Sequence, residues 1–267
     1  PKNIRFIKGD CADSKVLKKL QSIKFDTIFH IAGQSSGEIS FDNPINDLNR
    51  NLISTIKLAE FSLKNNVRKF IYASSMSVYG DLKEDKLNAK EKSKCNPLSF
   101  YGISKLSSEN YLKIFSKLGL DITILRFFNV YGPNQNLKNL RQGMISIYLG
   151  QLLKSNTIVI KGSLSRFRDF IYIDDVVKII DLCSAKKIAK NKTYNISTGY
   201  KTTVKEIISL ISKTTKKKIK IKLKGSTPGD QFGIYSKPIL LKKDLKIKKL
   251  ISIKDGIKKM IESIRYD

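Results

Sequence analysis

A tyrosine and a lysine four residues apart, Tyr101 and Lys105, are the residues whose types and spacing most directly suggest chemistry. On a helix their side chains would lie one turn apart on the same face. An ammonium group beside a phenol favours the phenolate and lowers the tyrosine pKa. A tyrosine tuned in this way can act as a general base near neutral pH, where a free tyrosine with a pKa of about 10 cannot. Because this spacing also arises by chance on solvated helices, the interpretation depends on the elements that position the pair.

The chain has 267 residues, 41% of them hydrophobic, which is enough for one large or two modest domains. No apolar run approaches the roughly 18 residues of a membrane span, so we expect no membrane association. Cys11, Cys95 and Cys183 are far apart and form no metal-ligand spacing. Reduced thiols, a cytoplasmic location and no bound metal are therefore expected.

The formal net charge of +28 is the most extreme feature of the composition. It is compatible with a nucleic-acid or acidic-membrane surface, or with a lysine-rich solvated surface. The basic residues are nearly all lysines spread through the chain, and the densest run, 213–224, alternates as a half-buried strand with its lysines facing water. We therefore favour the solvated surface, expect no nucleic-acid partner, and expect the charge to help capture an anionic, phosphate-bearing substrate.

Short apolar runs predict strands at residues 4–7, 27–31, 69–73 and 122–126, and amphipathic stretches predict helices near 14–22, 44–65 and 97–118. This alternation indicates a parallel sheet covered on both faces. Such sheets bind ligands at the carboxyl ends of their strands. One crevice is therefore expected to collect the four small or polar pairs that follow the strands, Gly9-Asp10, Ala32-Gly33, Ser74-Ser75 and Phe128-Asn129.

After the turn signal Gly132-Pro133 the pattern loosens. It predicts helices near 142–154, 204–213 and 253–264, a strand at 169–173 leading into a helix at Asp174-Asp175, and a strand at 193–196. We interpret residues 131–267 as a smaller lobe that faces the substrate, with the part near 168–196 returning to the main sheet.

Nine short motifs occur in one order along the chain. They are Gly9-Asp10 with Asp13, His30-Ile31-Ala32-Gly33, Asn51 with Thr55, Ala73-Ser74-Ser75 with Val78-Tyr79-Gly80, Tyr101 with Lys105, the run from Arg126 to Pro133, Arg168-Asp169-Phe170, Asn195-Ile196 with Gly199, and Pro228-Gly229-Asp230. In this order the chain resembles the extended short-chain dehydrogenase/reductase superfamily, specifically its NAD-dependent nucleotide-sugar epimerases and dehydratases of the UDP-glucose 4-epimerase type. The resemblance covers essentially the whole chain. It implies a Rossmann-like doubly wound parallel sheet, with residues 1–130 as the dinucleotide-binding domain and an α+β substrate-binding lobe.

The resemblance also implies roles for single residues. Tyr101 would take a proton from a sugar hydroxyl while NAD accepts the hydride, Lys105 would lower the Tyr101 pKa and bind the nicotinamide ribose, and Ser75 would hydrogen-bond the hydroxyl that becomes a ketone. The positions that match cofactor-binding residues of the family are Asp10, Cys11, Ile31, Ala32, Gly33, Asn51, Ser74, Tyr101, Lys105 and Phe128. Those that match substrate-binding residues are Ser75, Asn129, Arg168 and Asp230. His30, the single histidine, is expected to pack at the end of a buried strand.

Two departures from the family pattern are visible. Thr227 stands where an arginine often precedes Pro-Gly-Asp. No glycine-rich turn occurs before Gly9, and the residue that selects NAD or NADP is also absent. From this we expect that about fifty residues are missing at the front, that the chain as given binds cofactor poorly or not at all and can be inactive for that reason, and that it exposes a sheet edge prone to aggregation.

The epimerase interpretation is favoured over its relatives. Dehydratases carry an acidic pair after the strand-end Ser or Thr, where this chain has Met76-Ser77. Epimerisation of a UDP-sugar at C4 through a transient ketosugar requires only Ser75, Tyr101 and Lys105. The alternatives are a nucleotide-sugar ketoreductase, a 4,6-dehydratase, and a non-catalytic basic binding protein. The resemblance further implies a homodimer formed by the helices near 44–65 and 97–118, through apolar positions at Ile53, Ile56, Leu58, Tyr111, Leu112 and Phe115.

Overall fold

A four-stranded parallel sheet forms the centre of the computed structural model, which describes residues 3–82, 87–226, 228–229 and 231–264. Its strands are β1 (Thr27–His30), β2 (Lys69–Ser75), β3 (Asp121–Phe127) and β8 (Lys192–Ile196), in the order β1-β2-β3-β8. Three of these strands match the runs at 27–31, 69–73 and 122–126 within two residues at each end, and β8 matches the run at 193–196.

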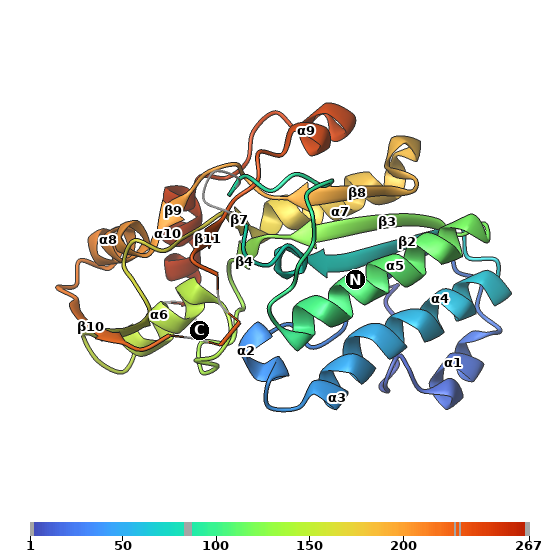
Figure 1. The fold of residues 1–267 in the computed structure, drawn as a ribbon, viewed down its shortest axis with the longest axis horizontal. Helices are drawn as coiled ribbons and strands as arrows, with labels where there is room; N and C mark the ends of the chain where they lie inside the picture. Colours follow the sequence, from blue (N-terminus) through green and yellow to red (C-terminus); the bar gives the residue numbers. More distant parts are fainter. Residues whose placement is uncertain (1–2, 83–86, 227, 230, 265–267) are drawn as a thin grey trace.

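Helices cover both faces of this sheet because successive strand residues point to opposite sides. On one face Phe70 and Tyr72 pack against α1 (Ser14–Leu20), α4 (Ser54–Lys64) and α5 (Phe100–Lys117). On the other face Ile71 packs against α7 (Ile173–Ala185) and α9 (Ile239–Leu245). Figure 1 shows the two helical layers on either side of the strands. The predicted doubly wound α/β fold is confirmed.

One predicted strand is wrong. Residues 4–7 form no strand, and Ile4 and Phe6 are 73% and 84% exposed. A strand is stabilised by a hydrogen-bonded neighbour, and this stretch pairs with none of the four strands of the main sheet. Its apolar composition alone therefore does not produce a strand.

The predicted helix at 44–65 is divided into three consecutive pieces. These are α3 (Pro44–Leu48), the π-helical turn η1 (Asn49–Ile53), and α4. Asn43 caps the start, its side chain accepting from the amide of Asn46, and Pro44 occupies the first turn, where its missing N–H costs nothing. A short helix, α2 (Gly37–Ser40), precedes it, and η2 (Met76–Val78) follows β2.

The smaller lobe is built from short paired strands and three helices. Here β4 (Asn129–Tyr131) pairs with β7 (Phe170–Tyr172), β5 (Thr157–Lys161) with β10 (Lys220–Lys224), and β6 (Phe167–Arg168) lies between β9 (Thr202–Thr203) and β11 (Gly233–Ile234). The helices α6 (Met144–Leu152), α8 (Val204–Thr215) and α10 (Ile253–Ile264) enclose its core with these strands. The turn η4 (Lys187–Ala189) leads into β8.

The lysine-rich strand differs from its prediction. All five residues of β10 are exposed, with Ile221 at 43% and Leu223 at 61%. β10 pairs only with β5, in a two-stranded sheet, and Lys222 and Lys224 face a cavity, so the apolar residues on the opposite side have no layer to pack against. Within the described part of the chain, no helix combines the length and apolar character needed to cross a membrane.

Candidate active site

Ser75, Tyr101 and Lys105 are brought together where β2 meets α5. Ser75 is the last residue of β2, and Tyr101 and Lys105 lie in the first two turns of α5. The helix begins after Ser99, whose hydroxyl oxygen accepts from the amide of Gly102 at 3.1 Å. All three side chains are buried, with 7%, 8% and 4% of their surface exposed. The predicted catalytic residues therefore share one buried position at a strand end.

A glycine makes this close approach possible. A Cβ atom on Gly102 would lie 2.7 Å from the carbonyl oxygen of Ser77 and 2.8 Å from the Pro97 side chain. Any other residue would push the first turn of α5 away from η2. Gly102 thus sets the distance between Tyr101 and the end of β2.

Burial determines the ionisation of the pair. It raises the pKa of Tyr101 to about 12, although a hydrogen bond from Ser75 acts in the opposite direction. It lowers the pKa of Lys105 to about 8. The expected lowering of the Tyr101 pKa is therefore wrong for this state of the chain. The Lys105 ammonium donates to the carbonyl oxygen of Ala73 at 2.9 Å and lies 5.8 Å from the centre of the Tyr101 ring.

Gly33 and Asn51 form a small cradle beside this site. Gly33 has φ +147°, and a Cβ atom there would lie 2.5 Å from Oδ1 of Asn51. The Asn51 amide nitrogen donates to Asp47 at 3.1 Å, while its Oδ1 is buried with no hydrogen-bond partner among the described residues. A buried acceptor next to backbone without a side chain fits a ligand that donates hydrogen bonds, as a ribose or amide group does. Gly33 and Asn51 therefore fit the ribose or amide groups of a dinucleotide.

The other predicted cofactor residues are less uniform. Ile31 and Ala32 are exposed at the end of β1, next to Gly33. Asp10 is exposed and accepts from the amide of Ala12 at 2.8 Å, while burial raises the pKa of the adjacent, half-buried Cys11. Ile31 and Ala32 therefore follow the carboxyl end of β1, and Asp10 and Cys11 lie in the loop before α1.

Two side chains predicted at the cofactor are used inside the protein instead. The hydroxyl of Ser74 donates to Glu109 at 2.5 Å. Phe128 packs in a buried cluster with Tyr79 and Ile234. Any contact of Ser74 or Phe128 with a cofactor is therefore left to their main chains.

A cavity of about 900 Å³ opens next to the catalytic residues, between the main sheet and the smaller lobe. Among its lining residues are the chain neighbours of Ser75 and Tyr101, namely Met76, Ser77, Leu98 and Ser99. Its cationic lining residues are Arg141, Lys154, Lys161, Arg166, Arg168, Lys222 and Lys224. Of the described lining residues, Glu38 is the one carboxylate. Such a cavity favours an anionic ligand.

The predicted substrate residues Asn129 and Arg168 both line this cavity. The buried Arg168 guanidinium donates to the carbonyl oxygens of Phe167 and Gln231, both at 2.7 Å, which fixes its orientation. The Asn129 amide donates to the carbonyl oxygen of Asp169 at 3.2 Å. The last of the four predicted substrate residues, Asp230, and Thr227 lie outside the described residues.

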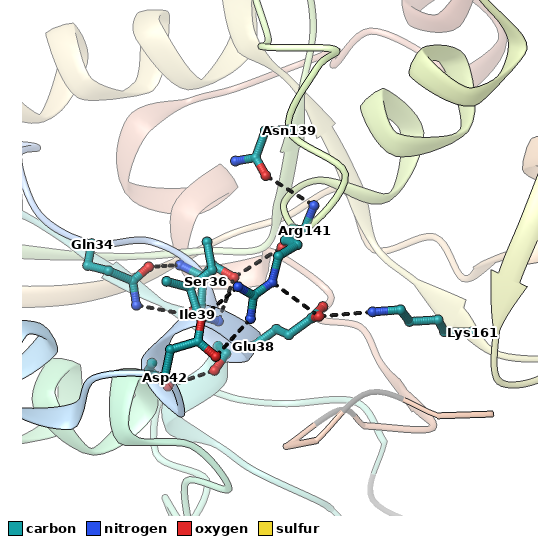
Figure 2. A network of polar contacts seen from close by, with 10 residues as sticks. Gln34, Ser36, Glu38, Ile39, Asp42, Asn139, Arg141 and Lys161 are labelled. Carbon is teal, nitrogen blue, oxygen red and sulfur yellow. Dashed lines mark hydrogen bonds and ion pairs between the residues drawn. The ribbon is translucent and has the colours of Figure 1, made fainter. Parts of the chain in front are cut away.

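An ion-pair network, which we call the clasp, lies at the cavity and consists of Glu38, Asp42, Arg141 and Lys161. Figure 2 shows Arg141 between the two carboxylates. Its guanidinium contacts Asp42 at 2.6 Å and Glu38 at 3.3 Å, and the Lys161 ammonium contacts Glu38 at 2.9 Å. The Ser36 hydroxyl also donates to the carbonyl oxygen of Arg141 at 3.1 Å. The clasp therefore joins the segment 36–42 to the lobe, and no motif in the sequence indicates it.

A second network, missed as such by sequence reasoning, lies beneath α5. Arg126 forms a bidentate ion pair with Glu109, at 2.6 and 2.9 Å, and both side chains are buried. Arg126 also donates to the Tyr79 hydroxyl at 2.9 Å, which in turn donates to Asn195 at 2.6 Å. Arg126, Tyr79 and Asn195 all lie in the motifs noted above. Their positions in these motifs are the sequence signal that could have indicated the network. In the structure the three residues help to anchor α5 to the sheet.

Comparison with known proteins agrees with this geometry. The family model "NAD dependent epimerase/dehydratase family" matches residues 1–197. A putative UDP-glucose 4-epimerase of Methanocaldococcus jannaschii is 33% identical, over 96% of this chain and 82% of its own length. The crystal structure of a Thermotoga maritima UDP-glucose 4-epimerase with UDP-glucose superposes with a TM-score of 0.94 at 30% identity, covering 100% of this chain and 86% of that one.

A further solved structure contains both kinds of ligand. A Bacillus cereus UDP-glucuronic acid 4-epimerase with UDP-glucuronic acid and NAD has a TM-score of 0.89 at 27% identity, and the match covers 98% of this chain and 82% of that one. The family match, the extent of the relatives and the fold confirm the resemblance inferred from the motifs. The chain belongs to the NAD dependent epimerase/dehydratase family, among its nucleotide-sugar epimerases.

Proposed function

We propose that this chain catalyses the epimerisation of a UDP-sugar at C4 through a transient 4-ketosugar. The observation that carries the proposal is that Ser75, Tyr101 and Lys105 are buried together where β2 meets α5. Met76 and Ser77, which directly follow Ser75, line a strongly cationic cavity. The relatives named as UDP-glucose 4-epimerases favour a UDP-hexose as substrate. Related structures with UDP-glucuronic acid make a uronic acid the first competitor to test.

The chain's own residues divide the work. Arg168 and Asn129, which both line the cavity, hold the diphosphate side of the substrate, where the positive charge of the guanidinium favours phosphate oxygens. Tyr101 removes the proton of the sugar hydroxyl and later returns it to the carbonyl oxygen. Ser75 donates a hydrogen bond to that oxygen as it becomes a carbonyl. Ser75, Tyr101 and Lys105 serve both the oxidation of the sugar and its reduction. The ketosugar therefore needs only to turn its other face toward the hydride before it is reduced.

The cofactor completes the chemistry. Bound NAD would supply the hydride acceptor and donor, and its oxidised ring would add a positive charge to the site. Gly33, Asn51 and Lys105 are the residues we assign to its nicotinamide side. Burial raises the Tyr101 pKa to about 12, and the Lys105 ammonium is hydrogen-bonded to the carbonyl oxygen of Ala73. Tyr101 therefore acts as a base only when a positive charge additional to that of Lys105 lies near the phenol.

Replacing the tyrosine tests the proposal. Tyr101→Phe is expected to lower turnover of UDP-glucose by about 10²–10⁴-fold while leaving UDP-glucose binding intact, because only the proton transfer is lost. Tyr111→Phe is the matched control, since Tyr111 lies on the same helix and is 49% exposed. Both are assayed with added NAD, and NAD released on denaturation measures cofactor content. Turnover by Tyr101→Phe close to that of the parent would remove Tyr101 as the base.

Two alternatives from the same family remain testable in that assay. A ketoreductase would consume a reduced cofactor stoichiometrically, whereas an epimerase leaves the cofactor unchanged after each turnover. A 4,6-dehydratase would form a 4-keto-6-deoxy product. It is disfavoured because Met76 and Ser77 follow Ser75, and neither side chain is an acid or a base near neutral pH.

Two proposals concern the organisation of the chain. We assign cofactor binding to residues 1–130 and substrate binding to 131–267, with 168–196 returning to the main sheet. We also propose a homodimer through α4 and α5. Leu58 and Leu112, two of the residues considered for that interface, are buried in the core. The contact surface therefore falls to exposed apolar positions such as Ile103 and Ile114 of α5 and Leu118 at its C-cap.

A further inference from the structure

Asp47 is a buried carboxylate beside the catalytic pair for which the proposed function gives no role. It lies in α3 with 1% of its surface exposed. Its Oδ1 accepts from the amide nitrogens of Gln34 at 2.8 Å and Asn51 at 3.1 Å, and its Oδ2 accepts from the Ser104 hydroxyl at 2.7 Å. Three donors converge on one side chain, which is the environment of an ionised carboxylate.

These three contacts join the elements that form the site. Gln34 follows Gly33, Asn51 lies on η1, and Ser104 precedes Lys105 on α5. Because a carboxylate only accepts hydrogen bonds, it fixes the Asn51 amide with the nitrogen toward Asp47. The Asn51 oxygen is then directed elsewhere, and it is the buried, unpartnered acceptor beside Gly33. The orientation of the cradle thus follows from the charge on Asp47.

Asp47 also lies close to Lys105, because its Oδ2 accepts from Ser104, the neighbour of Lys105 on α5, and its negative charge favours the ammonium. Other ionisable groups face this ammonium from every side: Tyr101 and Glu109 on α5, Tyr72 on β2, and His30 on β1. Glu109 is already paired with Arg126 at 2.6 Å, and burial lowers the pKa of His30 to about 3, which keeps it neutral. Asp47 is therefore the carboxylate best placed to compensate the buried Lys105 ammonium.

We propose that Asp47 is a positioning residue of this site, which directs the Asn51 oxygen toward the Gly33 cradle and keeps the Lys105 ammonium charged. This proposal rests on the proposed function, because Asn51 and Lys105 have their roles in that reaction. Its test does not, because the charge state of Lys105 can be measured without cofactor or substrate.

The test is a pH titration by NMR of the chain labelled with ¹³C at the ε carbon of lysine. Burial lowers the pKa of Lys105 to about 8, so its resonance is expected to titrate well below those of ordinary lysines, and it is assigned by its loss in Lys105→Met. Asp47→Asn is expected to move this midpoint down by about one pH unit, because the neutral amide no longer favours the ammonium. Ser104→Ala removes one hydrogen bond but keeps the charge, and its midpoint is expected to match the parent.

Asp47→Ser is the second neutral variant, since its smaller side chain leaves room for a water molecule to accept from the same donors. Unfolding by urea adds a readout that covers poorly folding variants. Asp47→Asn is expected to lower the free energy of unfolding less in the Lys105→Met background than in the parent, because no ammonium needs compensation there. The proposal would be overturned by any of three results. The Lys105 midpoint could stay unchanged in both Asp47→Asn and Asp47→Ser, or it could shift equally in Ser104→Ala. Asp47→Asn could also lower the free energy of unfolding equally in the parent and in Lys105→Met.

Failure of the proposed function gives a different pattern. A chain without epimerase activity whose Lys105 midpoint still falls in Asp47→Asn retains the role of Asp47 and loses only the reaction. If the chain is active, the pH profile of turnover in Asp47→Asn is expected to shift to lower pH by about the same one unit on both limbs, because removing a negative charge lowers the pKa of Tyr101 and of Lys105 alike.

Discussion

Burial acts in the same sense on three ionisable side chains near the end of β2. It raises the pKa of Tyr101 to about 12, lowers that of Lys105 to about 8, and lowers that of His30 to about 3. In each case the neutral form is favoured, because the charged form loses its hydration. The site is therefore tuned by desolvation first and by its carboxylates second.

His30 gives this desolvation a measurable consequence for stability. Its ring contacts Phe70 and Tyr72, and its Nε2 lies 3.0 Å from the Thr55 hydroxyl oxygen. Because its folded pKa of about 3 lies below the ordinary value of 6.5, the unfolded chain binds a proton between these pH values and the folded chain does not. Stability is therefore complete above pH 6.5 and falls on acidification by about 1.4 kcal/mol per pH unit.

Urea unfolding at pH 7 and pH 5 measures this effect. The free energy of unfolding is expected to fall by roughly 2 kcal/mol more in the parent than in His30→Gln. His30 is the single histidine of the chain, so no other imidazole contributes. An equal fall in both proteins would mean that His30 is protonated in the folded state.

At this scale the sequence predicts position better than energy. The spacing of Tyr101 and Lys105 correctly places both on one buried face of a helix. It did not predict the Tyr101 pKa, because the sign of that shift depends on how deeply the phenol is buried. The Lys105 contact with the Ala73 carbonyl and the role of Asp47 depend equally on long-range packing, across 32 residues in the first case.

At the scale of elements, local pattern was sufficient where a strand has neighbours. β1, β2 and β3 were predicted from continuous apolar runs, which suit a strand buried on both faces. β2 and β3 are buried in this way, while β1 lies at the edge with Phe29 46% exposed and pairs with β2. Residues 4–7 have the same character and remain unpaired, and β10 has the predicted alternation but no layer beneath it. Pairing and layering are tertiary facts, so periodicity alone could not separate these cases.

The clasp is the element-level feature with the clearest functional consequence. Arg141 joins the segment 36–42 to the lobe at the cavity through exposed ion pairs, and such pairs contribute little to stability. Arg141→Gln is therefore expected to change the free energy of unfolding by less than about 1 kcal/mol. It is expected to speed UDP-glucose dissociation several-fold, since the cavity opens more readily. Stopped-flow displacement of a fluorescent UDP-sugar measures the rate.

Charge reversal separates the clasp from a direct contact of Arg141 with phosphate. The double variant Asp42→Arg with Arg141→Asp restores an ion pair at the same place but removes the cation from position 141. Recovery of slow dissociation in the double variant supports the clasp, and continued fast dissociation assigns the effect to phosphate binding. Lys138→Gln, an exposed change in the same loop, is the control.

At the scale of the whole molecule, α5 presents two different faces. Tyr101, Lys105 and Leu112 point inward to the site and the core. Ile103 and Ile114 are 49% and 55% exposed, and Leu118, the C-cap of the helix, is 64% exposed. The exposed three lie within one helical stripe at spacings of eleven and four residues. The homodimer proposed above would bury this stripe, and burying it would also immobilise the helix that carries Tyr101.

Reversing the polarity of this stripe tests the homodimer. Ile114→Lys places a charge at the centre of the stripe and is expected to convert a dimer into a monomer at micromolar concentration, because an unpaired buried charge costs several kcal/mol. Val177→Lys, at a 58% exposed position of α7 on the opposite face of the sheet, is expected to leave the dimer intact. Sedimentation equilibrium gives the mass of each. A parent that sediments as a monomer would exclude the dimer, and an Ile114→Lys variant that remains dimeric would move the interface away from α5.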